Sequence, residues 1–286
     1  MSAPSPETHR LEPIAWNSWI AVPTLDSNAL SAVLMEPLTA IGVRAAAAIR
    51  RFGADAGFRL KADGSPVTAA DEAAEAVISD GLRGLATALP IVSEEQAERD
   101  RPHDPSGSYF LVDPLDGTRE FIAGSAEYAV NIALVTDGMP MLGVIAAPAL
   151  GLLWRGAVGR GAERMTFTGD GQVSRPSAIR TRRRPSAELT VMVSRSHLEA
   201  RTRAHLEGLS QVKLVPCGSA IKFCRLAEGA ADHYPRLAPT HDWDVGAGHA
   251  ILTAAGGCVI APDGGPLVYG SAASGWRWAL RLDRRR

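Results

Sequence analysis

The sequence predicts an architecture that combines α+β and α/β parts, and three features of the chain indicate it. The second half, from residue 189 to residue 260, alternates short apolar runs with helical segments, a pattern typical of α/β proteins. In the first half, two apolar runs flank an Asp137-Gly138 turn, as in a β-hairpin. A chain of 286 residues is long enough for one large domain or two moderate ones.

We divide the chain into an N-terminal extension (1–28), an α+β part (29–157) and an α/β part (158–286). The extension is rich in Pro, Ser and Glu, and we expect its Trp16 and Trp19 to dock on the body of the protein or on a second subunit. Between the two larger parts, residues 159–188 are rich in Gly and Ser and hold an Arg182-Arg183-Arg184 triplet. This triplet beside Pro185 could bind phosphate, and we favour a solvated loop for it.

Apolar residues recur at helical spacing from Leu30 to about Phe52 and predict an amphipathic helix, with Pro37 in its first turn or at a kink. A second helix begins after a polar loop, with Thr68 as its N-cap, and extends to about Leu89. The further elements expected are strands over 90–93, 109–113, 128–136, 141–147, 152–157, 189–193, 212–215, 231–234 and 258–260, and helices over 197–209, 219–228 and 245–255.

Charge and cysteine content limit the classes of function. The formal net charge of −1 provides no general attraction to nucleic acid. The three cysteines form no CxxC pair, which fits a reducing cytoplasm. We identify no apolar run near the roughly 18 residues that a membrane span requires, and no signal peptide. We therefore expect a cytoplasmic protein without a transmembrane segment, and peripheral contact with the inner membrane stays open.

Residues 109–121 contain the first candidate site. An apolar strand ends in Asp113 and Asp116, two carboxylates on a short turn that suit Mg²⁺, and the carbonyl of Leu115 can face the same cavity. Thr118 opens a predicted helix, where unpaired amides favour a phosphate. The alternative is a strand, an Asp-Gly turn and a helix N-cap without any ligand.

Two further carboxylates can complete an all-oxygen set. Glu94 follows a short strand, and Asp244 lies at the start of a helix of small residues. Each has a structural alternative, because adjacent glutamates usually lie in solvent and an aspartate at a helix start often only caps it. With Asp113 and Asp116 they form a ligand set suited to magnesium. Two such ions can activate water and stabilise the leaving oxygen in phosphate ester hydrolysis.

Eight strings between about residues 30 and 270 form one pattern. They are DGSPVTAAD (63–71), VSEE (92–95), YFLVDPLDGTREFI (109–122), VNIALV (130–135), SRSH (194–197), GSAIKFC (218–224), AEGAADHYPR (227–236) and WDVGAGHAIL (243–252). In this order and spacing they resemble the inositol monophosphatase superfamily of lithium-sensitive, magnesium-dependent phosphatases, and most closely its bacterial 3′(2′),5′-bisphosphate nucleotidases of the CysQ type.

The resemblance implies a layered αβαβα sandwich with the active site between the two larger parts. It also implies two or three Mg²⁺ ions per site. Glu94, Asp113 and the Leu115 carbonyl would bind the first ion, and Asp113, Asp116 and Asp244 the second.

The catalytic residues implied by the resemblance are Asp71, Glu94 and Thr118. Thr118 would hydrogen-bond Asp71 and, together with Glu94, help to activate the attacking water. For Asp71 this role competes with helix capping, and we favour catalysis. The amides of Gly117 and Thr118 would hold the scissile phosphate at a helix N-terminus.

The substrate contacts implied by the same resemblance are Gly117, Thr118, His197, Ser219, Lys222, Arg236 and Asp244. Lys222 and Arg236 would supply cations for a substrate with two phosphates. Each has a simpler interpretation, because a lone Lys or Arg is usually solvated and His197 can cap its helix. Ala220 departs from a serine that is common in this branch, which would remove one hydroxyl contact.

The predicted function is hydrolysis of the 3′-phosphate of adenosine 3′,5′-bisphosphate (PAP) to AMP and phosphate, in the setting of sulfate assimilation. Action on the sulfated analogue PAPS stays open. One alternative is an inositol or other sugar monophosphatase, which would gain little from Lys222 and Arg236; another is a non-catalytic nucleotide sensor. By analogy with the family we expect inhibition by lithium and calcium, and a monomer or a homodimer.

Overall fold

In the computed structural model of the protein, the described residues are 27–53, 57–96, 107–183, 185, 188–195, 199–237, 239–261, 264–270 and 280–284. The predicted N-terminal extension, with Trp16 and Trp19, therefore lies almost entirely outside the described residues. The predicted substrate contact His197 also lies outside them.

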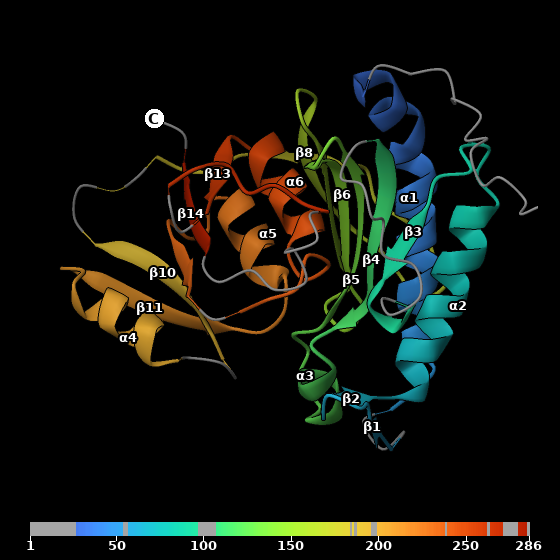
Figure 1. The fold of residues 1–286 in the computed structure, drawn as a ribbon, viewed down its shortest axis with the longest axis horizontal. Coiled ribbons are helices and arrows are strands. Elements are labelled where there is room, and N and C mark those ends of the chain that lie inside the picture. The colour runs from blue at the N-terminus through green and yellow to red at the C-terminus, as the bar shows by residue number, and fades with distance from the viewer. Residues whose placement is uncertain are drawn as a thin grey trace, which may run out of the picture.

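Helices and sheets stack in five layers (Figure 1). Helices α1 (Ser27–Ile49) and α2 (Ala69–Arg83) pack on one face of a seven-stranded sheet, and α5 (Ile221–Ala227) and α6 (Gly246–Ala254) cover the other face. Beyond α5 and α6 lie a smaller group of strands and then α4 (Ala200–Glu207). The predicted αβαβα sandwich is therefore confirmed.

The central sheet follows the chain from edge to edge. Its strands are, in order, β3 (Ile91–Ser93), β4 (Ser108–Asp116), β5 (Ala129–Thr136), β6 (Met139–Ala147), β7 (Leu152–Ala157), β8 (Gly161–Thr166) and β9 (Ser177–Ile179). Strand β3 pairs with β4 in parallel, and the other neighbouring pairs are antiparallel.

The sequence analysis predicted no strand within residues 159–188, but β8 and β9 lie there and extend the sheet. In β8 only Ala162 and Met165 are buried, and two small or flexible apolar residues give too weak an alternation to detect in the sequence. The domain boundary at residue 157 stays a prediction.

The second half builds the smaller group of strands. The parallel pair is β10 (Leu189–Ser194) with β11 (Val212–Cys217), and the three-stranded sheet has the order β12 (Tyr234–Arg236), β14 (Leu280–Arg284), β13 (Gly257–Ile260). The predicted strand over 231–234 is wrong in its bounds, because residues 232 and 233 make single hydrogen bonds to β10 before β12 begins. Strand β14 lies in the Arg-rich tail, for which the sequence predicted no element.

Helix α1 carries a long apolar run into the core. Leu38, Ile41 and Ile49 are buried there. By length and composition residues 29–49 would suffice to cross a membrane, so the prediction that no apolar run approaches that length is wrong. In this segment, however, 56% of the most apolar stretch is buried inside the protein, and packing in the core accounts for its hydropathy. Pro37 lies within the helix rather than in its first turn.

Helix α2 begins at the predicted cap. Thr68 and Asp71 form a reciprocal capping box, in which Asp71 Oδ2 accepts from the Thr68 amide at 2.8 Å. The helix ends at Arg83 and not near Leu89 as predicted. Gly84 is its C-cap, since glycine has a low helix propensity and the next residues form turns.

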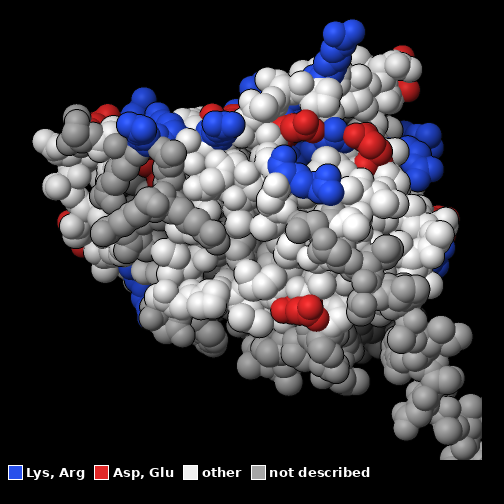
Figure 2. All heavy atoms as spheres, turned by 90° about the horizontal axis from the view of Figure 1, so that it is seen from above, with Lys and Arg blue, Asp and Glu red and all other residues white. Residues whose placement is uncertain are grey.

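Lys and Arg side chains are mixed with Asp and Glu on the face drawn in Figure 2. The described residues of this face do not form one continuous basic surface, in agreement with the formal net charge of −1. This face therefore offers no electrostatic footprint of the kind that binds nucleic acid.

Helix α6 lies directly on strand β6 because both present small residues. A Cβ atom added to Gly143 would lie 2.2 Å from Ala247 O, and one added to Gly248 would lie 2.4 Å from Phe223 Cγ. The glycines thus allow α6 to approach both the sheet and α5. This close approach fixes the height above the sheet of the turn before α6, which carries Asp244.

We predict that Gly143→Ala lowers the free energy of unfolding by about 3 kcal/mol or more, because the added methyl group overlaps backbone atoms of α6 that cannot move aside. Urea unfolding of the metal-free protein measures the change. Gly169→Ala is the matched control, since its Cβ would meet atoms only at 3.9 Å and its φ is not positive. Equal stability of the two variants would contradict the prediction.

Candidate active site

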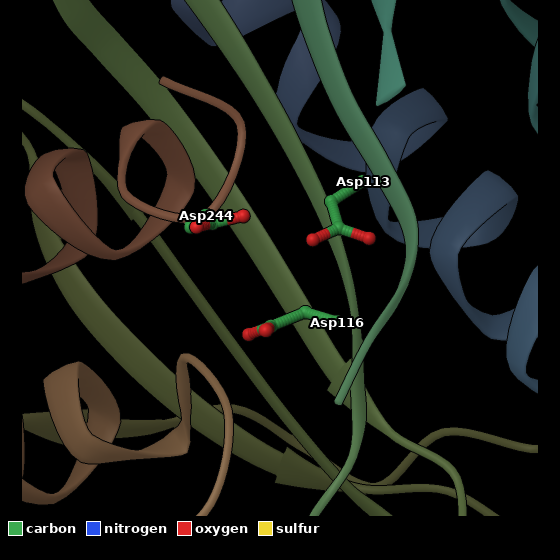
Figure 3. Close-up of side chains that lie close together, drawn as sticks. All are labelled: Asp113, Asp116 and Asp244. Carbon is green, nitrogen blue, oxygen red and sulfur yellow. The ribbon is translucent and has the colours of Figure 1, made fainter. Parts of the chain in front are cut away.

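Three carboxylates from two distant segments converge in front of the central sheet (Figure 3). Asp113 and Asp116 come from the end of β4, and Asp244 comes from the turn before α6. Ligand oxygens of the three residues lie within 4.8 Å of one another. Among the described residues they form a group that can hold a metal ion.

A local irregularity in β4 brings its two aspartates to the same side. In a regular strand, residues three apart point to opposite faces. Here Asp113 pairs with Asn131 and Asp116 pairs with Ala129, with a shift of register between them. One extra residue on β4 restores the common face, and Pro114, which has no N–H to donate to the neighbouring strand, lies at this shift.

Hydrogen bonds orient the two β4 carboxylates. Asp113 Oδ1 accepts from the Leu115 amide at 3.1 Å. Asp116 Oδ2 accepts from the amide of Ala220 and, at 3.4 Å, from Asn131 Nδ2. The Ala220 contact joins β4 to the second half of the chain.

Asp244 is held by the turn that precedes it. Its Oδ2 accepts from Thr240 Oγ1 at 2.5 Å and from the His241 amide at 3.1 Å. The N-cap of α6 is Val245. The alternative that Asp244 serves only as a helix cap therefore finds no support in its contacts.

The carboxylates repel one another in a buried site. Burial raises the pKa of Asp113 well above its usual value, and the charges of Glu94, Asp116 and Asp244 raise it further. Burial and then Asp244 raise the pKa of Asp116 to about 7, against the opposing charge of Lys222. A divalent cation would remove this repulsion, and donor atoms that are all oxygen fit a hard cation.

Glu94 opens the 3₁₀ turn Glu94–Gln96 after β3 and lines the same cavity. Lys61 Nζ lies 2.8 Å from Glu94 Oε1 and 2.5 Å from Glu95 Oε1. The solvated interpretation of Glu94 is wrong, because its side chain is only 26% exposed and is paired. Lys61 is a contact that the sequence reasoning missed, since the loop that carries it gave no indication of its partner.

Asp71 takes part in two hydrogen-bond systems at once. Its Oδ2 completes the capping box with Thr68, and its Oδ1 lies 3.1 Å from Thr118 Oγ1. The hydroxyl of Thr118 also lies 3.1 Å from the Leu115 carbonyl oxygen, so its one hydrogen is shared between two acceptors. Capping and contact with Thr118 are therefore compatible, although the sequence analysis treated them as competing.

The turn after β4 depends on glycine. Gly117 has a φ of +93°, in the left-handed region, and precedes α3 (Thr118–Ile122). A Cβ atom at this position would also lie 3.2 Å from Glu127 O. Gly117 and Thr118 both line the cavity, so the turn places backbone amides next to the carboxylates.

Most of the candidate site residues described above surround a cavity of about 240 Å³. Asp71 lies behind Thr118 and does not line it, and His197 is outside the described residues. The predicted site residues that line the cavity are Glu94, Asp113, Leu115, Asp116, Gly117, Thr118, Ser219, Lys222, Arg236 and Asp244. Lining residues that the sequence analysis did not single out include Ser65, Arg119, Glu120, Ser194, Tyr234 and Thr240.

Of the two predicted substrate cations, Lys222 is buried and Arg236 is half-buried. Lys222 is 3% exposed and donates to the carbonyls of Ser219 at 2.6 Å and Cys217 at 3.2 Å. Arg236 Nη2 donates to Pro239 O at 3.2 Å, while its buried Nε has no hydrogen-bond partner among the described residues. Neither side chain is the solvated surface cation of the simpler interpretation.

We predict that the affinity for Mg²⁺ rises with pH between about 6 and 8. The pKa of Asp116 is raised to about 7. At lower pH the metal-free carboxyl therefore holds a proton, and a cation that binds there must displace it. Affinity should therefore fall by up to about tenfold per pH unit below 7. Calorimetric titration of metal-free protein at pH 6, 7 and 8 measures this. Equal affinity at all three pH values would contradict the prediction.

Comparison with known proteins agrees with this arrangement. Residues 34–277 match the model of the inositol monophosphatase family. The 3′(2′),5′-bisphosphate nucleotidase CysQ of Shigella flexneri is 44% identical over 209 residues, which cover 73% of this chain and 81% of that protein.

Two solved structures show the same fold. CysQ from Bacteroides thetaiotaomicron, a bacterial member of the inositol monophosphatase family, superposes with a TM-score of 0.73 at 32% identity, covering 88% of this chain and 97% of that one. Inositol monophosphatase from Anabaena superposes with a TM-score of 0.69 at 25% identity, covering 88% and 91%. With its acidic triad at the end of β4 and before α6, the chain belongs to the inositol monophosphatase family.

Proposed function

We propose that the protein is a magnesium-dependent phosphatase that removes the 3′-phosphate of PAP, giving AMP and phosphate. One observation carries the proposal: the acidic triad of Asp113, Asp116 and Asp244 shares its cavity with two cations, the buried Lys222 and the half-buried Arg236. A substrate with two phosphates needs positive charge at two places, and this cavity can offer metal at one and side chains at the other. The bisphosphate nucleotidase relatives support the same choice.

Asp113, Asp116 and Asp244, with Glu94 and the Leu115 carbonyl, would hold two or three Mg²⁺ ions. When bound, these ions supply Lewis-acid stabilisation of the charge on the phosphate and on the leaving O3′. The protein residues then have three tasks: to orient the phosphate, to orient the water and to accept its proton.

Thr118 and Glu94 are suited to handle the attacking water. Thr118 donates its hydrogen toward Asp71 Oδ1 and Leu115 O, which leaves its oxygen lone pairs free to accept a hydrogen bond from water. The Glu94 carboxylate would take the proton as water attacks phosphorus in line. Lys61 neutralises part of the charge on Glu94, so its distance from Glu94 will influence how readily Glu94 accepts that proton.

The second phosphate is assigned to the side of the cavity formed by Ser219, Lys222 and Arg236. The ammonium group of Lys222 has three N–H donors, of which the carbonyls of Cys217 and Ser219 use two. One donor is left for a ligand, and Arg236 contributes its unpaired Nε. Ala220 offers no hydroxyl at the adjacent position.

The same proposal includes a cytoplasmic location, inhibition by lithium, and a monomer or a homodimer. The family resemblance supports the lithium inhibition and the oligomeric state, and the cysteine content supports the location. Action on PAPS, in which the 5′-phosphate bears a sulfate, also belongs to the proposal as an open choice of substrate.

An inositol or sugar monophosphatase is the second candidate, and one observation favours it. Most of the hydrogen-bonding capacity of Lys222 is already used by backbone carbonyls. If its remaining role is to hold the loop, the cavity needs to bind only one phosphate.

We predict that the protein releases phosphate from PAP at least tenfold more efficiently than from inositol 1-phosphate, and that Lys222→Met removes most of this preference. Methionine keeps the unbranched stem but loses the charge. The measurement is kcat/KM for both substrates with Mg²⁺. Lys213→Met is the matched control, because Lys213 is an exposed lysine on β11 outside the cavity.

Preference for inositol 1-phosphate would favour the second candidate. If neither substrate turns over while PAP still binds tightly, the protein is a nucleotide sensor. Both results would overturn the proposed reaction.

We predict that Asp71→Asn lowers kcat by about a hundredfold or more, because Thr118 loses a charged acceptor that orients it toward water. Thr68→Val is the control for capping. It removes the Thr68 Oγ1 contacts to Ala70 and Asp71 and should lower stability by about 1 kcal/mol while kcat stays within a fewfold. Steady-state kinetics and urea unfolding of both variants separate the two roles, and equal losses of kcat would contradict the prediction.

A further inference from the structure

A short loop carries the cationic side of the cavity. Residues 217–222, which we call the cation loop, connect β11 to α5 and include Ser219 and Lys222. The loop is internally braced, because Lys222 Nζ donates to two of its own carbonyls. Any displacement of the loop would therefore move Ser219 and Lys222 together.

Two acidic residues from the first half of the chain hold the cation loop from outside. The amide of Ala220 donates to Asp116, and the amide of Gly218 donates to Glu127 Oε2 at 2.7 Å. Asp116 belongs to the candidate metal site. Glu127, which lies between α3 and β5, has no role in the reaction proposed above.

Glu127 is itself fixed by a two-pronged ion pair. Arg195 Nε lies 2.9 Å from Glu127 Oε2, and Arg195 Nη2 lies 3.0 Å from Glu127 Oε1. The same Nη2 also donates to Pro216 O at 3.3 Å, one residue before the cation loop, and the Arg195 amide donates to Cys217 O at 3.3 Å. Glu127 thus bonds the loop both directly and through Arg195, and a two-pronged geometry restrains rotation of the carboxylate.

The backbone packing around Glu127 leaves the cation loop little freedom. A Cβ atom at Gly218 would lie 2.7 Å from Glu127 O, and one at Gly117 would lie 3.2 Å from the same oxygen. Ser219 has a φ of +49°, an uncommon conformation for a residue with a side chain. Glu127 therefore contacts the metal-site turn through its carbonyl and the cation loop through its carboxylate.

From these contacts we propose that Glu127 is a positioning residue for recognition of the second phosphate. It sets the distance between the carboxylates of β4 and the cation loop, and so the separation of two phosphates that the cavity accepts. The inference rests on the proposed function, because it assumes a substrate with two phosphates. It assigns Glu127 no contact with the substrate.

The test compares PAP with adenosine 3′-monophosphate, which has the same scissile phosphate but lacks the second one. In Glu127→Ala we expect kcat/KM for PAP to fall about tenfold to a hundredfold, as for loss of a charged hydrogen bond. The value for adenosine 3′-monophosphate should change less than about threefold, since the metal side stays intact. A residue that only stabilises the fold would lower both values equally.

Two further variants keep the test decisive. Glu127→Gln retains an acceptor for the Gly218 amide but loses the charge that pairs with Arg195. We therefore expect a partial loss of kcat/KM for PAP and no loss for adenosine 3′-monophosphate. This variant replaces Glu127→Ala if the alanine variant does not fold. Glu163→Ala is the matched control. Glu163 lies on β8, its carboxylate pairs with Arg155 at 2.8 Å, and it does not line the cavity.

The outcomes separate the two proposals. If the wild-type protein does not prefer PAP over adenosine 3′-monophosphate, the proposed function fails. If the wild-type protein prefers PAP and the Glu127 variants keep that preference, only the inference about Glu127 is overturned.

Discussion

Mutual repulsion among buried carboxylates is the constraint on which the site depends. Asp113, Asp116 and Asp244 place their oxygens within 4.8 Å of one another, and burial together with this repulsion raises the pKa of both Asp113 and Asp116. Such a cluster is unfavourable without protons or a cation. The surrounding hydrogen bonds, from backbone amides and from Thr240, keep the carboxylates in place despite that cost.

Rigid backbone elements hold the carboxylates close together despite their repulsion. A shift of register in β4 turns its two aspartates to one side, and Gly143 admits the α6 backbone so closely that the preceding turn lies over the sheet. Neither feature touches a substrate. Together they decide whether Asp244 can meet the β4 aspartates, because the packing of α6 on β6 leaves little room for adjustment.

The two halves of the chain are also joined by hydrogen bonds at the site. Amides of the cation loop donate to Asp116 and Glu127, which belong to the first half. Asp116 of the candidate metal site and the Lys222 side chain are therefore linked through one short loop. The choice of substrate can therefore depend on the distance between the β4 carboxylates and the cation loop, as well as on the residues that each side presents.

Much of the site is predictable from short stretches of sequence. The apolar run that ends in Asp113 and Asp116, the glycine at position 117 and the cap at Thr68 all depend on neighbouring residues, because strand alternation, left-handed turns and helix caps are set by local backbone preferences. Residue types alone also placed Asp244 in the ligand set, with helix capping as the alternative, and the resemblance to a known family added the layer order and the role of each ligand.

Other features depend on contacts that no local pattern records. The pairing of Lys61 with Glu94 and the dual use of Asp71 become visible only in the folded chain, as does the ion pair that holds Glu127. The sequence by itself therefore determined local features such as the end of β4 at Asp116, the turn at Gly117 and the helix cap at Thr68. The tertiary structure alone decided which charges meet, because distances between side chains far apart in the sequence are set by the packing of whole helices and strands.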